Sequence, residues 1–161
     1  MKVIFLDIDG VMNGFARPIN PSIEKRVWTP NLMREYGIEL EVFPELVERI
    51  NKIAEDTGAF FVISSSWRIG YLADWADVII YLHNMGLKGF ILGRTPWGED
   101  LRKRGLEIQA WLKQHKDENI ESFIILDDDG DMEPFMNRLV QTDHKYGIQD
   151  EHVHKAIEML K

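Results

Sequence analysis

The sequence contains no cysteine, which excludes disulfide bonds and thiolate metal sites. It also lacks any apolar run close to the roughly 18 residues that a membrane-spanning helix needs. A chain without disulfides fits a reducing compartment. We therefore expect a cytoplasmic protein with no membrane partner, and nothing in the sequence indicates an obligate protein partner.

Length and composition indicate one soluble domain. The chain has 161 residues, of which 45% are hydrophobic and 29% are charged, as is usual for globular proteins. It is too short for two large domains, so we expect a single domain over residues 1–161. The formal net charge of -8 argues against tight, sequence-independent binding to long nucleic acid, because such binding depends on Lys and Arg. A nucleotide or the end of a strand stays possible.

Apolar runs alternate along the chain with stretches of helical periodicity, the pattern of an α/β doubly wound parallel sheet. The predicted strands are residues 3–6, 59–63, 90–92, 123–126 and 139–142. Helices are predicted between Pro44 and Gly58, before Gly86, over 104–115, and at the C-terminal end after a cap at Asp150.

The first predicted strand ends in two carboxylates. Asp7 and Asp9 follow the apolar run and precede Gly10. In parallel sheets ligands bind beyond the carboxyl ends of strands, and side chains alternate, so both carboxylates can point one way while Ile8 turns into the core. Two anions this close repel unless a cation or a shared proton lies between them. A hard divalent metal is the expected partner.

The second predicted strand ends in hydroxyl groups and a cation. Ser64, Ser65 and Ser66 precede Trp67 and Arg68. Hydroxyls, backbone amides and a guanidinium at a strand end suit phosphate oxygens. Serines also form turns and helix caps, which is the alternative interpretation.

Three cations, Arg102, Lys103 and Arg104, open the helix predicted over 104–115. Cations are disfavoured at helix N-termini because the macrodipole is positive there. A nearby anion would explain them, and a solvated basic face is the alternative.

The fourth predicted strand ends in an acidic run, with aspartates at 127–129 and 131. Their alternate spacing resembles a calcium loop, but Met132 replaces the required glycine and Arg138 the bidentate glutamate. The calcium-loop interpretation therefore fails. Two interpretations of this acidic run remain: a strand end that binds a metal, and an acidic turn without a ligand.

In this order the four motifs resemble those of haloacid dehalogenase (HAD) superfamily phosphatases. The finer pattern is similar to the HAD domain of RNA-repair proteins and to the phosphatase half of phage polynucleotide kinase-phosphatases; it covers residues 5–11, 65–68, 95–96, 104–108 and 126–128. The resemblance implies a Rossmann-like HAD fold, in which 12–41 would be a small flap or cap, or else a surface excursion packed by its own aromatic residues.

The resemblance also implies roles for single residues. Asp7 would be the nucleophile that forms an aspartyl-phosphate, and Asp9 the general acid and base. Ser64, or Ser65 if the strand ends one residue later, would hold the phosphoryl group. Arg104, or Lys103, would neutralise charge between the nucleophile and the phosphoryl group. The remaining substrate-binding candidates are Gly10, Ser65, Trp67 and Arg68, and the ligands of the implied Mg²⁺ are Asp7, the carbonyl of Asp9, and Asp127 or Asp128.

The expected reaction is magnesium-dependent hydrolysis of a phosphomonoester, on a nucleotide or a polynucleotide 3'-phosphate. An open site would suit a strand end, with Trp28, Trp67 or Trp97 stacking on bases. Packing within the protein is the alternative role for each tryptophan. The alternatives are a phosphatase for an unrelated small phosphorylated metabolite, since a fold does not specify a substrate, and a non-catalytic metal- or phosphate-binding module.

Overall fold

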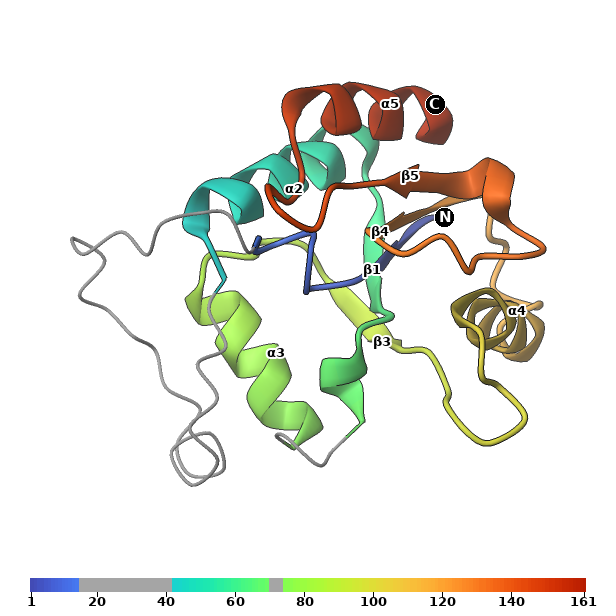
Figure 1. Ribbon diagram of the computed structural model, residues 1–161. Coiled ribbons are helices and arrows are strands. Elements are labelled where there is room, and N and C mark those ends of the chain that lie inside the picture. The colour runs from blue at the N-terminus through green and yellow to red at the C-terminus, as the bar shows by residue number, and fades with distance from the viewer. Residues whose placement is uncertain (15–41, 70–73) are drawn as a thin grey trace.

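The computed structural model describes residues 1–14, 42–69 and 74–161 (Figure 1). Its centre is a five-stranded parallel sheet in the order β3–β2–β1–β4–β5. The strands are β1 (Lys2–Leu6), β2 (Phe60–Ile63), β3 (Ile91–Arg94), β4 (Ser122–Asp127) and β5 (Leu139–Gln141). The predicted α/β parallel fold is confirmed, and no strand end differs from its prediction by more than two residues.

Helices cover both faces of the sheet, which explains why the strands are continuous apolar runs. The helices are α2 (Pro44–Thr57), α3 (Trp75–Asn84), α4 (Arg104–Gln114) and α5 (Asp150–Leu160). Ile4 and Leu6 of β1 face a core formed with α2, α3 and α5. Val3 and Phe5 face the other core, formed with α4. Figure 1 shows α2 and α5 side by side, with α4 on the far side of the sheet.

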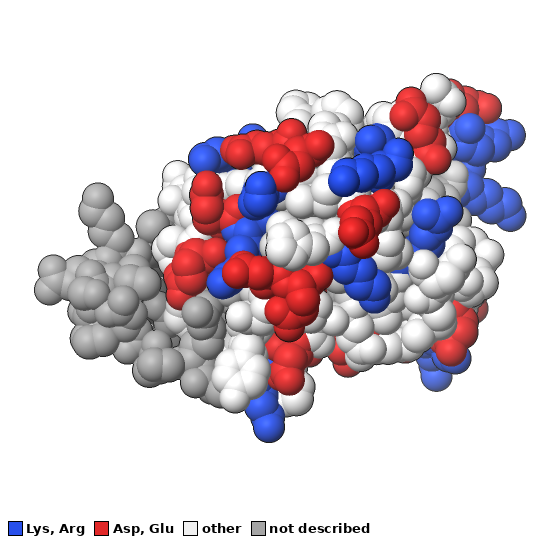
Figure 2. Space-filling model, turned by 90° about the horizontal axis from the view of Figure 1, so that it is seen from above, with Lys and Arg blue, Asp and Glu red and all other residues white. Residues whose placement is uncertain are grey.

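The outer surface of α2 and α5 carries charges of both signs. In Figure 2, which views the molecule from above, Lys and Arg side chains lie among Asp and Glu side chains over this face. Arg49 of α2 pairs with Asp150 of α5 at 2.8 Å, and Lys52 pairs with Asp56 at 2.9 Å. This face therefore offers no broad surface of one charge.

Helix ends follow the expected residues with one exception. Helix α2 begins at Pro44 and stops at Gly58, whose φ of 68° lies in the left-handed region that glycine adopts without strain. The predicted cap of α5 is wrong by one position. Asp150 is the first helical residue, and Gln149 precedes the helix and donates its N–H to Nδ1 of His152 at 2.9 Å.

Two predictions reach outside the described residues. Of segment 12–41 the structure describes only 12–14, where Met12 is buried and its carbonyl accepts a hydrogen bond from the N–H of Phe43 at 2.9 Å. Residues 15–41, including Trp28, lie outside the described ranges. A flap over the site and a single domain over 1–161 therefore stay predictions. Among the residues that the structure describes, no helix is long and apolar enough to cross a membrane.

Helix α4 begins in close contact with the loop that follows β4. The N–H of Arg104 donates to the Asp131 carboxylate and the N–H of Gly105 to the Asp131 carbonyl, both at 3.2 Å. A Cβ atom on Gly105 would lie 2.2 Å from the carbonyl oxygen of Glu133. Only glycine allows the helix to start this close to the end of β4.

We expect Gly105→Ala to destabilise the protein. Alanine favours a helix interior over glycine by about 1 kcal/mol, but the clash with backbone atoms outweighs this gain. The free energy of unfolding, measured by urea denaturation, should fall by about 1–3 kcal/mol, the usual effect of overpacking. Gly98→Ala is the control, because no atom lies within 4 Å of the added Cβ. A Gly105→Ala protein as stable as the unmodified chain would contradict this packing.

Candidate active site

The two central carboxylates lie at the point where the winding of the sheet reverses. The chain runs from β1 outward to β2 and β3, then returns to β4 on the other side of β1. Asp7 directly follows β1 and Asp127 ends β4, and the N–H of Asp7 donates to the carbonyl of Leu126 at 2.9 Å. Such switch points are where open α/β sheets bind ligands.

Asp7, Asp127 and Asp128 form an acidic cluster. Each offers a carboxylate oxygen, and these three oxygens lie within 4.8 Å of one another. Gly10 makes the cluster possible: its φ is 70°, and a Cβ there would lie 2.3 Å from Cγ of Asp128. Gly10 thus allows Asp128 to approach the turn after β1.

Burial makes this cluster costly in the absence of a cation. Burial raises the pKa of Asp7, and the nearby Arg104 guanidinium opposes that rise. Burial also raises the pKa of Asp127, and the negative charge of Asp7 raises it further. Oδ2 of Asp127 is buried and accepts no hydrogen bond within the described part of the chain. A set of clustered carboxylate oxygens with an unsatisfied buried member fits a hard divalent cation such as Mg²⁺.

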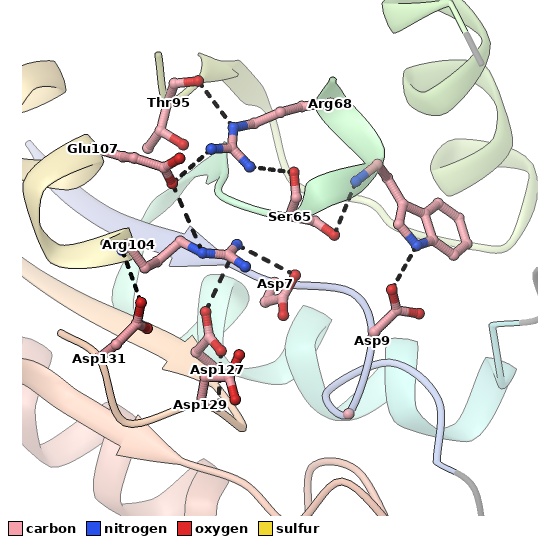
Figure 3. Close-up of polar contacts among 12 residues, drawn as sticks. Asp7, Asp9, Ser65, Arg68, Thr95, Arg104, Glu107, Asp127, Asp129 and Asp131 are labelled. Carbon is pink, nitrogen blue, oxygen red and sulfur yellow. Dashed lines mark hydrogen bonds and ion pairs between the residues drawn. The ribbon is translucent and has the colours of Figure 1, made fainter. Parts of the chain in front are cut away.

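Arg104, the first residue of α4, brings a positive charge to the acidic cluster. Its Nη1 lies 3.6 Å from Oδ1 of Asp7 and 3.8 Å from Oδ2 of Asp127 (Figure 3). Lys103 precedes the helix and is exposed. Of the two candidate cations, Arg104 is therefore the one that the structure places beside the acidic cluster, and these anions account for a cation at a helix N-terminus.

Ser64 and Ser65, which follow β2, are buried and differ in their partners. The N–H of Ser64 donates to the carbonyl of Leu6 at 2.8 Å, whereas its hydroxyl has no hydrogen-bond partner among the described residues. The hydroxyl of Ser65 accepts from the N–H of Trp67 at 3.4 Å and caps the short 3-10 helix η1 (Ser66–Arg68). Ser65 therefore caps η1, and a hydrogen bond with its side chain also opposes the rise that burial causes in the pKa of Asp7. Both serines stay candidates for contact with a phosphoryl group.

Asp9 is held away from the acidic cluster by two donors. Nε1 of Trp67 donates to Oδ2 of Asp9 at 2.9 Å, and Nδ2 of Asn13 donates to Oδ1 at 2.9 Å. Trp67 is 4% exposed and packs against Tyr81. The Trp67 ring therefore orients Asp9 and is not open for stacking on a base. Sequence reasoning did not identify Asn13, because no pattern in the chain marks it as a partner of Asp9.

Arg68 points into the protein. It is 1% exposed, its Nε donates to the carbonyl of Thr95 at 3.0 Å, and its Nη2 lies 2.6 Å from Oε2 of Glu107. Sequence reasoning gave Glu107 no role. Its position three residues after Arg104 on a predicted helix was the available signal, because residues at this spacing lie side by side.

Three comparisons with known proteins bear on these residues. Residues 3–153 match the family model described as the HAD domain in Swiss Army Knife RNA repair proteins. No curated protein and no solved structure matched the chain. The matched range runs from β1 into α5 and so contains every site residue described above. Members of the HAD superfamily generally use Mg²⁺, in keeping with the acidic cluster.

The match supports a phosphatase of HAD type, a hydrolase, in general terms. Because it extends over most of the sequence, the chain belongs to the family of HAD domains found in Swiss Army Knife RNA repair proteins.

Proposed function

We propose that this protein is a magnesium-dependent phosphomonoesterase that acts through an aspartyl-phosphate, on the 3'-phosphate end of a polynucleotide or on a nucleotide. The proposal rests mainly on the charged groups that surround Asp7. This buried carboxylate faces the Arg104 guanidinium at 3.6 Å and shares an acidic cluster with Asp127 and Asp128. A carboxylate nucleophile with a cation beside it is what transfer of a phosphoryl group requires.

The residues divide the reaction into two steps. In the first, a carboxylate oxygen of Asp7 attacks phosphorus as the bond to the leaving oxygen breaks, and Asp9 gives that oxygen a proton. In the second, Asp9 takes a proton from water, which attacks phosphorus and releases inorganic phosphate and free Asp7. Mg²⁺ held by the acidic cluster and the carbonyl of Asp9 would offset the negative charge of the phosphoryl group. Arg104 and the Ser64 hydroxyl would orient its oxygens.

An exposed tryptophan at the carboxyl edge of the sheet supports a nucleic-acid end as the substrate. Trp97 follows β3 at the same edge of the sheet as Asp7, and 43% of it is exposed. Its ring centre lies 4.8 Å from the Arg94 guanidinium carbon, which also lies 5.1 Å from the ring centre of Trp75. Nη1 of Arg94 in turn donates to the carbonyl of Arg68 at 2.7 Å. An exposed ring fixed in this way is a platform on which a base can stack.

Asp7→Asn should abolish turnover, because an amide is a poor nucleophile. We expect kcat for a phosphomonoester to fall by at least about a thousandfold, in line with the loss of other catalytic nucleophiles. Steady-state phosphate release measures this effect, and circular dichroism checks the fold. Asp117→Asn, at an exposed position after α4, is the matched control and should keep full activity. Wild-type turnover by Asp7→Asn would overturn the mechanism.

Removal of Mg²⁺ with EDTA should stop the reaction, and added Mg²⁺ should restore it. Asp127→Asn should raise the half-saturating Mg²⁺ concentration by about 10-fold or more, because it removes one charged oxygen ligand. Asp129→Asn changes an exposed neighbour outside the acidic cluster and should leave the Mg²⁺ dependence unchanged. Equal Mg²⁺ dependence in both variants would rule out Asp127 as a ligand.

Trp97→Ala should weaken the binding of oligonucleotides selectively. Stacking on one base contributes about 1–3 kcal/mol, so KM for a 3'-phosphorylated oligonucleotide should rise about 5- to 150-fold. KM for p-nitrophenyl phosphate should not change. Phe90→Ala removes an exposed aromatic residue just before β3, at the opposite end of that strand, and is the control. Hydrolysis of sugar phosphates in place of oligonucleotides, with no effect of Trp97→Ala, would indicate a small-metabolite phosphatase instead.

A further inference from the structure

A chain of alternating charges runs through the protein interior from the loop after β2 to the acidic cluster (Figure 3). Nη2 of Arg68 lies 2.6 Å from Oε2 of Glu107, and the same oxygen lies 3.8 Å from Nε of Arg104. Arg104 then faces Asp7. The side chains of Arg68, Glu107 and Arg104 are 1%, 11% and 16% exposed, so the chain of charges is largely shielded from water.

Arg68 connects three segments that carry site residues. Its guanidinium donates to the carbonyl of Ser65 in the loop after β2 and to the carbonyl of Thr95 after β3, and it pairs with Glu107 of α4. These contacts direct its donors inward. In this orientation Arg68 does not point toward a phosphate at the edge of the sheet. It can affect the site only by holding the three segments in place.

Glu107 lies beside the Nε edge of the Arg104 guanidinium. The guanidinium is planar and rigid, so an anion beside Nε fixes where Nη1 points. Nε of Arg104 faces Glu107, and Nη1 faces Asp7 and Asp127. Without Glu107, the Nε edge of the Arg104 guanidinium would lose the carboxylate that lies 3.8 Å away, and the contacts of Nη1 with Asp7 and Asp127 would be left to orient the group.

A purely structural role accounts poorly for this arrangement. Buried ion pairs contribute little net stability, because desolvation offsets the attraction, and apolar replacements of similar volume are often as stable or more so. The Arg68–Glu107 pair lies next to Arg104, the cation beside Asp7. An effect of the pair on the orientation of Arg104 explains this arrangement better.

We propose that Glu107 and Arg68 are positioning residues: Glu107 orients the Arg104 guanidinium toward Asp7, and Arg68 fixes Glu107 together with the serine loop. Neither residue touches the transferring phosphoryl group. The expected kinetic effects of this inference rest on the proposed phosphatase function. The positioning role itself rests on contacts within the protein.

The kinetic test uses two variants. Glu107→Gln keeps the size of the side chain and removes its charge, and we expect kcat to fall about 10- to 100-fold, the effect of a misplaced catalytic group, with little change in KM. Arg68→Met/Glu107→Leu removes both charges together, so no buried charge is left unpaired. It should stay folded in thermal unfolding and show the same loss of kcat. Wild-type kcat in this folded double variant would overturn the proposal.

A double-mutant cycle tests whether Glu107 acts through Arg104. In an Arg104→Ala background, Glu107→Gln should cause no further loss of kcat, because the group that it positions is gone. An equal loss in both backgrounds would contradict the proposal. Glu158→Gln, at an exposed position of α5, is the matched control and should leave kcat unchanged.

A measurement on the resting protein separates this inference from the proposed function. The Nε–H of Arg104 can be followed by nuclear magnetic resonance, and its hydrogen exchange should be at least about 10-fold faster in Glu107→Gln than in the unmodified chain, since a buried contact is lost. Unchanged exchange would overturn the positioning role even if phosphatase activity is found. If the unmodified protein hydrolyses no phosphomonoester, the proposed function fails, and faster exchange would still support the role of Glu107.

Discussion

The repulsion between Asp7 and Asp127 is the constraint on which the rest of this structure depends. Two unit charges about 4 Å apart interact by about 4 kcal/mol at an effective dielectric constant of 20, and both carboxylates are almost fully buried. Within the described part of the chain, Arg104 offsets this repulsion directly, because its Nη1 lies within 3.8 Å of both carboxylates. With Asp128 the acidic cluster has three carboxylates, so two negative charges are left beside Arg104 when all three are ionised, and a divalent metal would balance them. The site is therefore built for cations and for the anionic group that they attract.

Helix α4, which packs against one face of the sheet, places Arg104 in the site. The helix starts at Arg104, and the contact of Gly105 with the loop after β4 brings this start to the end of the strand that carries Asp127. Asp131 accepts hydrogen bonds from the first N–H groups of the helix, which would otherwise lack partners. Helix capping and placement of the cation are thus achieved by the same few residues.

The framework of the fold could be predicted from the sequence because its signals are local. Buried parallel strands are continuous apolar runs, and their last residues mark the carboxyl edge of the sheet. The resemblance of the motifs to those of HAD phosphatases then implied that Asp7, Ser64 and Asp127 belong to one site. Partners that are distant along the chain could not be predicted. Arg68 ends a motif that suits phosphate, and only the positions of Thr95 and Glu107 show that it turns inward. The Thr142 hydroxyl that binds the Gly10 carbonyl lies 132 residues away, beyond any sequence pattern.

The short helix η1 joins the two sides of the site. Successive residues of a 3-10 helix are about 120° apart around its axis, so Trp67 and Arg68 point in different directions. Trp67 donates to Asp9, the proposed acid and base, while Arg68 reaches Glu107 and through it Arg104. The cap of this helix is Ser65, next to Ser64, whose buried hydroxyl has no hydrogen-bond partner among the described residues. A change in η1 would therefore move the acid, the cation and the hydroxyl together, and this common dependence keeps the groups around Asp7 in register with one another.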